Sequence, residues 1–108
     1  MIEEYVTELV LSRKGIHLKR MNRHNVRKIA HIINESTSIE PAIFGMPTSC
    51  RTIREAQTSH ETNYGRNLYI EITRGKVDPR TLVRILGDAG YRVLDIKTKE
   101  DRGNGSER

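Results

Sequence analysis

The residues with the clearest chemical meaning are basic side chains near the start of the chain. Between Leu9 and Asn34 there are seven lysines and arginines and three histidines, and there is no aspartate or glutamate. The whole chain has a formal charge of +5, whereas the residues outside this segment, with 12 basic and 14 acidic side chains, sum to −2. Such a concentration of positive charge is typical of a surface that binds a polyanion. The candidate phosphate-binding residues are Arg13, Lys14, Lys19, Arg20, Arg23, Arg27 and Lys28.

A second set of basic residues lies in the polar stretch from Ser36 to Arg66. Arg51, Arg54 and Arg66 could bind a phosphate there, because guanidinium groups match the geometry of phosphate oxygens. These residues favour a different class of protein: an oligomeric binder of a small anionic ligand such as a nucleotide, or an inhibitor that docks on an acidic protein surface.

Residues that could hold a metal ion or act in catalysis are less convincing. His24 and His31 are seven residues apart and Glu35 follows, but no cysteine or second nearby histidine completes a recognisable ligand set. We therefore expect surface histidines, with no metal and no cofactor.

One short pattern resembles part of a nuclease site. Asp95, Ile96 and Lys97 form an acid-x-Lys sequence, and with a second acid at Glu71 they could hold Mg²⁺ and orient water. A three-residue pattern is common by chance, so we expect a protein that is not an enzyme and keep a metal-dependent nuclease as the alternative.

Length and composition limit the class of protein. A chain of 108 residues with 35% apolar residues corresponds to one domain. Cys50 is the single cysteine, which excludes an internal disulfide and favours a reducing compartment. No apolar run approaches the about 20 residues of a membrane span, and the three acids between Met1 and Leu11 are unlike a signal peptide. We expect a cytoplasmic protein without a membrane partner.

The first half of the chain predicts a hairpin and a helix. Residues 6–11 and 16–18 are apolar stretches around Gly15, which predicts a β-hairpin; an N-terminal helix is the alternative. Asn22 is suited to cap a helix whose apolar residues recur at helical spacing: Val26, Ile29, Ala30 and Ile33.

The second half predicts a β-α-β unit. Leu68, Ile70 and Ile72 alternate with polar residues as in a half-buried strand, and Asp78 and Pro79 then begin a helix that stops at Gly90. Residues 91–98 follow as a strand with Leu94 and Ile96 facing the core. The two strands of such a unit are expected to be parallel.

Together these elements predict an α+β fold of ββα-loop-βαβ order. We expect a two-layer sandwich in which a four-stranded mixed sheet carries two helices on one face, a variant of the ferredoxin-like plait. Residues 1–98 would form the single domain, with 36–66 as a long, partly mobile loop and 99–108 as a disordered tail. A strand hidden between Ile39 and Met46 would add an edge to the sheet. The bare sheet face could pair two copies as a homodimer.

The leading hypothesis for function follows from the charge. We expect a small basic accessory or regulatory protein that binds DNA or RNA, with phosphate contacts from the hairpin and the first helix. Such contacts do not read sequence, so the affinity should be modest and fall with salt.

Overall fold

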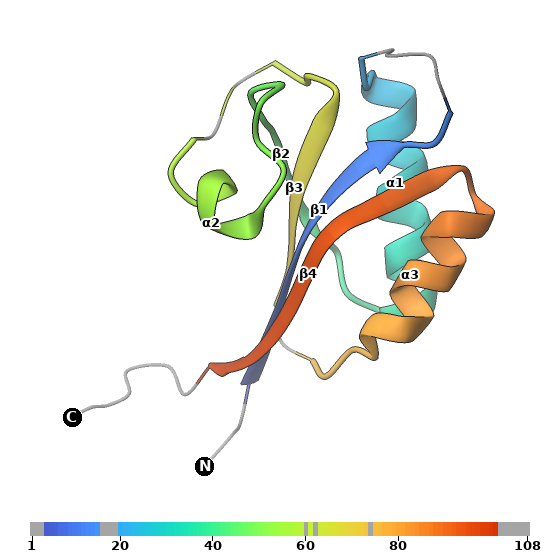
Figure 1. The fold of residues 1–108 in the computed structure, drawn as a ribbon. Helices are drawn as coiled ribbons and strands as arrows, with labels where there is room; N and C mark the ends of the chain where they lie inside the picture. Colours follow the sequence, from blue (N-terminus) through green and yellow to red (C-terminus); the bar gives the residue numbers. More distant parts are fainter. Residues whose placement is uncertain (1–3, 16–19, 60, 62, 74, 102–108) are drawn as a thin grey trace.

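The computed structural model describes residues 4–15, 20–59, 61, 63–73 and 75–101 (Figure 1). In chain order the elements are β1 (Glu4–Arg13), α1 (Arg23–Thr37), β2 (Ala42–Gly45), α2 (Ile53–Ala56), β3 (Asn67–Thr73), α3 (Pro79–Asp88) and β4 (Tyr91–Asp101). Strand β4 thus extends to Asp101, three residues into the segment expected to be a tail. None of the described helices is long and apolar enough to cross a membrane.

The four strands form an open sheet in the order β2-β3-β1-β4, and every neighbouring pair is antiparallel. The prediction of a mixed sheet is therefore wrong. Strands β3 and β4 do run in the same direction, as their connection through a helix predicts, but β1 lies between them. Leu9, Val10 and Leu11 are all fully buried, so β1 is covered on both faces, as a central strand must be.

The order ββα at the start of the chain is also corrected. The expected strand 6–11 lies within β1, whose two neighbours both come from the C-terminal half of the chain. Its expected hairpin partner, 16–18, lies outside the described residues. The strand that takes the place of 16–18 in the four-stranded sheet is β2. It lies within the 36–66 stretch that was expected to be a loop, and it pairs with β3 at the edge of the sheet. The same stretch contains α2.

Helices α1 and α3 cover one face of the sheet (Figure 1), as predicted. The Asn22 side chain accepts a hydrogen bond from the Asn25 N–H at 2.9 Å, and the Asn25 side chain accepts one from the Asn22 N–H, which completes a capping box. Ile29 and Ile33 then pack into the main core, together with Leu82 of α3.

The other face of the sheet is not bare, because α2 and the chain around it cover part of it (Figure 1). Ile53 and Ala56 of α2 pack with Val10 and Tyr69 in a second, smaller core. On this face, which was expected to be bare, only the part of the sheet beside α2 is left uncovered. A homodimer through that part stays a prediction.

A bulge in β4 changes which side chains face the helices. Val10 pairs with Asp95 and Leu11 pairs with Val93, so Leu94 is an extra residue without a partner on β1. Ile96 packs in the main core as predicted, but Leu94 packs on the α2 side, which corrects its expected position. Tyr91, before the bulge, is buried on the helix side.

Candidate functional site

The seven predicted phosphate-binding residues do not all lie on one exposed surface in the structure. Lys19 lies outside the described residues. Arg13 ends β1 and is half-buried, and Lys14 and Lys28 contact the end of α3. The remaining three are exposed on or just before α1: Arg20, Arg23 and Arg27.

Two of the lysines have a structural partner. Lys14 Nζ donates to the carbonyl oxygen of Gly87 at 2.9 Å, and Lys28 Nζ donates to that of Ala89 at 3.4 Å. Lys28 Nζ also lies 5.8 Å from the ring centroid of Tyr91. Carbonyl groups at a helix C-terminus lack intrahelical partners and attract cations. These two lysines therefore hold the end of α3 against β1 and α1.

The outward side of α1 carries arginines that form no ion pair with the described residues. Asn25, Ile29 and Ile33 are buried, which turns Arg23 and Arg27 away from the sheet. Among the described residues, neither these two arginines nor Arg20 takes part in an ion pair. The first turn of α1 has no acidic residue, so Arg23 lies at the positive end of the helix dipole without compensation. This arrangement costs helix stability, and a bound anion would offset that cost.

Two exposed basic residues on α3, the other helix of the same layer, were missed in the sequence. Leu82 and Leu86 are buried, so Arg80 and Arg84, each two positions away, are exposed on the opposite side of the helix. The helical spacing of the two leucines was the signal that could have identified them. Val83 beside them is 44% exposed. We call the exposed set the arginine surface: Arg20, Arg23, Arg27, Arg80 and Arg84.

The histidines of α1 show no metal-binding arrangement. His31 Nε2 lies 3.5 Å from Glu35 Oε1 in an exposed contact between neighbouring helical turns. In the ranges that the structure describes, no three His, Cys, Asp or Glu side chains are grouped closely enough to hold a metal ion.

The loop arginines of the alternative hypothesis are placed around α2. Asn67 Nδ2 donates to the carbonyl oxygen of Cys50 at 2.6 Å, which brings the backbones next to Arg51 and Arg66 together. Arg51 and Arg54 are exposed and Arg66 is half-buried. An anion site formed by these three residues stays a prediction.

Two carboxylates already accept hydrogen bonds from the N–H groups at the start of α2 and just before it. Glu55 Oε2 accepts the N–H groups of Arg51 and Thr52 at 2.9 and 3.0 Å. These hydrogen bonds lower the pKa of Glu55. Asp95 Oδ2 accepts the N–H of Ile53 at 3.0 Å. Asp95, a proposed nuclease ligand, therefore serves to hold α2 on the sheet.

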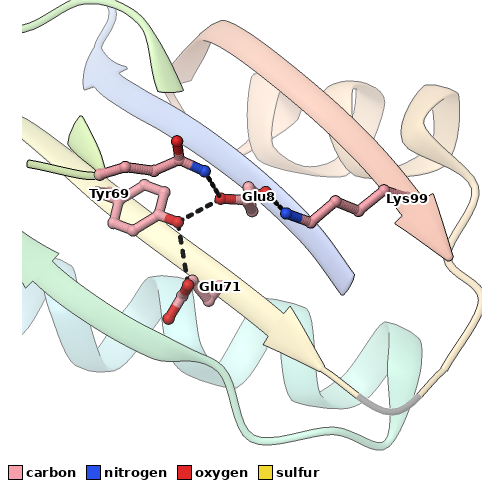
Figure 2. A network of polar contacts seen from close by, with 5 residues as sticks. Glu8, Tyr69, Glu71 and Lys99 are labelled. Atoms are coloured by element: carbon pink, nitrogen blue, oxygen red, sulfur yellow. Dashed lines mark hydrogen bonds and ion pairs between the residues drawn. The ribbon is translucent and has the colours of Figure 1, made fainter. Parts of the chain in front are cut away.

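A polar network lies on the same face of the sheet as α2 (Figure 2). Glu8 projects from the middle of β1, and its side chain is 3% exposed. Its Oε2 accepts hydrogen bonds from the Tyr69 hydroxyl at 2.5 Å and from Gln57 Nε2 at 2.7 Å. Lys99 Nζ lies 3.5 Å from Glu8 Oε1, and Glu71 Oε2 lies 3.0 Å from the Tyr69 hydroxyl. Glu8 could not be identified from the sequence, because its partners come from distant parts of the chain.

The network changes the proton affinity of two of its members. Burial raises the pKa of Glu8, but the hydrogen bonds from Tyr69 and Gln57 and the ammonium group of Lys99 outweigh this effect, so the pKa is lowered overall. Burial and the hydrogen bonds to Glu8 and Glu71 raise the pKa of Tyr69. At neutral pH the network thus contains an ionised Glu8 and a neutral Tyr69.

We expect Glu8 to make the free energy of unfolding depend on pH in the acid range. Its pKa in the folded protein lies below its ordinary value of 4.5, so its contribution is complete above that value and is lost as the pH falls through the folded pKa. The measurement is urea unfolding of the wild type and Glu8→Gln at pH 7 and at about pH 3. The wild type should be the more stable at pH 7, and the difference should shrink in acid. A difference independent of pH would contradict this role of Glu8.

Comparison with known proteins gives no match: no family model, no curated protein and no solved structure is similar to this chain.

Proposed function

We propose that the protein binds DNA or RNA through the arginine surface, as a small accessory or regulatory protein. The observation that carries this proposal is the row of exposed guanidinium groups on and before α1 that have no acidic partner among the described residues. Arg23 and Arg27 are one helical turn apart, which corresponds to a rise of about 6 Å along α1. Each guanidinium can donate two parallel hydrogen bonds to phosphate oxygens.

The packing of the two helices widens the proposed surface. Helices α1 and α3 cover the same face of the sheet, and Lys14 and Lys28 fix the C-terminal end of α3. The exposed arginines of both helices then face the solvent from one layer. The contacts would follow the backbone of the nucleic acid rather than read its bases, because phosphate contacts carry no sequence information.

The sheet order supports a more specific fold assignment. We infer a variant of the ferredoxin-like plait, since β3, α3 and β4 form a β-α-β unit whose two strands are separated by β1. The helix α2 is the addition to that plan.

We expect saturable binding that weakens strongly as salt increases. If all five arginines contact phosphates, the logarithm of the affinity should fall with the logarithm of salt with a slope of about −4.5 on duplex DNA. The measurement is fluorescence anisotropy with labelled single-stranded and duplex DNA and RNA at several salt concentrations. Absence of binding at about 50 mM salt would exclude the proposed function, since electrostatic binding is strongest there.

A further inference from the structure

A pocket lies on the sheet face opposite to α1 and α3, next to the end of α2. Its volume is about 390 Å³, and its polar lining includes Glu8, Gln57, Tyr69, Glu71 and Lys99. Figure 2 shows Glu8 of β1, Tyr69 and Glu71 of β3 and Lys99 of β4 converging on one place. Gln57, which follows α2, joins them through its hydrogen bond to Glu8. The arginine surface is on the other side of the sheet, so this pocket is independent of the proposed function.

One oxygen of the buried Glu8 carboxylate, Oε1, has no hydrogen-bond donor among the described residues. Glu8 Oε1 is buried and accepts no hydrogen bond from the residues that the structure describes, although the Lys99 ammonium lies 3.5 Å away. A buried carboxylate oxygen without a donor loses free energy relative to water. A ligand that brings an N–H group to this atom would recover that loss.

The Tyr69 hydroxyl cannot donate fully to both carboxylates that lie next to it. It lies within hydrogen-bond distance of both Glu8 Oε2 and Glu71 Oε2, yet it has one proton and can satisfy one carboxylate fully. The pocket therefore has more acceptor oxygens than donated protons. A group with several N–H bonds complements such a site better than a carboxylate or a phosphate does.

The net charge of the side chains that line the pocket also favours a cationic ligand. Glu8 and Glu71 contribute two negative charges and Lys99 one positive charge, which favours a cation. Lys99 is 49% exposed, so its ammonium can move into solvent when another cation arrives. A divalent metal ion is a poorer match, because the described residues include no group of three metal-binding side chains.

We propose that this pocket binds a small organic cation that carries a primary ammonium or guanidinium group. The cationic group donates hydrogen bonds to Glu8 Oε1 and to Glu71, and it takes the place of the Lys99 ammonium. The ligand is small enough for a space of about 390 Å³.

The test uses agmatine, which carries both a guanidinium and an ammonium group, and follows its binding to the full chain by calorimetry. Glu71→Gln should weaken agmatine binding about fivefold, the loss of one half-exposed charge pair. Lys99→Met keeps the apolar part of the side chain and removes the competing ammonium, so it should strengthen agmatine binding by about threefold. Asp88→Asn, an exposed change of the same charge on α3, is the matched control and should leave the affinity unchanged.

The control Asp88→Asn distinguishes the proposal from a general charge effect, because such an effect would weaken agmatine binding in Asp88→Asn and in Glu71→Gln alike. Equal affinity of agmatine for Glu71→Gln, Lys99→Met and the wild type would overturn it. Binding of acetate or Mg²⁺ in preference to agmatine would overturn it as well. Both variants change half-exposed or exposed residues, and their urea unfolding midpoints serve to show that the fold is intact.

Discussion

Reversing two charges on α1, with Arg23→Glu and Arg27→Glu together, should reduce nucleic-acid affinity by about a hundredfold or more. Two phosphate contacts are lost and two repulsive charges replace them. The slope of affinity against salt should also fall by about two, since that slope counts the phosphate contacts. Anisotropy titrations of the double variant and the wild type at the same salt concentrations measure both effects.

The fold should tolerate this double substitution. Both arginines are exposed and have no acidic partner among the described residues. Glutamate near the N-terminus of α1 interacts favourably with the helix dipole, so the urea midpoint should be unchanged or higher. A loss of binding could then not be ascribed to unfolding.

A matched variant changes the same charge elsewhere. Arg51→Glu with Arg54→Glu alters two exposed arginines at α2, in the 36–66 stretch, and leaves the arginine surface intact. It should retain most of the nucleic-acid affinity. The proposal would be contradicted if this variant lost affinity to the same extent as the α1 variant, and a selective loss here would favour the loop as the anion site.

Gly45→Ala should lower the free energy of unfolding by about 3 kcal/mol, at the upper end of the usual cost of overpacking. Gly45 ends the edge strand β2 and is buried. A Cβ at this position would lie 2.1 Å from the carbonyl oxygen of Asn63 and 2.8 Å from its carbonyl carbon. These are backbone atoms, and the same segment is held by the N–H of Glu61, which donates to the Gly45 carbonyl at 3.0 Å. The segment must therefore move to admit a methyl group.

A second glycine provides the control for Gly45→Ala. Gly87 lies in α3, where an added Cβ would meet only the flexible end of Lys14 at 3.4 Å. Gly87→Ala should leave the stability unchanged or raise it by up to about 1 kcal/mol, because alanine favours the helix. Urea unfolding midpoints at constant m-value compare the three proteins. Equal midpoints for Gly45→Ala and the wild type would show that the close approach of the backbones is not required.

Helices α1 and α3 could be predicted from the sequence because their signals are local. The cap at Asn22 and the spacing of Ile29 and Ile33 lie within one short segment, and so do Asp78, Pro79 and Leu82. The outward position of Arg23 and Arg27 follows from the same spacing. Lys14 and Lys28 could not be separated from the other basic residues, because their partners at the end of α3 are distant in the sequence.

The sheet could be predicted only in part, because strand neighbours are set by long-range packing. Glycine at position 15 favours a local hairpin, whereas the run Leu9 to Leu11, apolar on both faces, indicates a central strand. The edge strand β2 has four residues and gives no clear period. The network around Glu8 joins β1, β3 and β4 and the segment after α2, so no local sequence pattern predicts it.

The central position of β1 has a consequence for how the protein folds during synthesis. Strand β1 leaves the ribosome before its two neighbours, β3 and β4, which follow α1, β2 and α2 in the chain. It must remain without these two partners until the later segments have emerged, and loops that join such distant segments close slowly. The sheet therefore forms late in synthesis, and α2, a single turn that depends on β1 and β4 for its packing, forms no earlier.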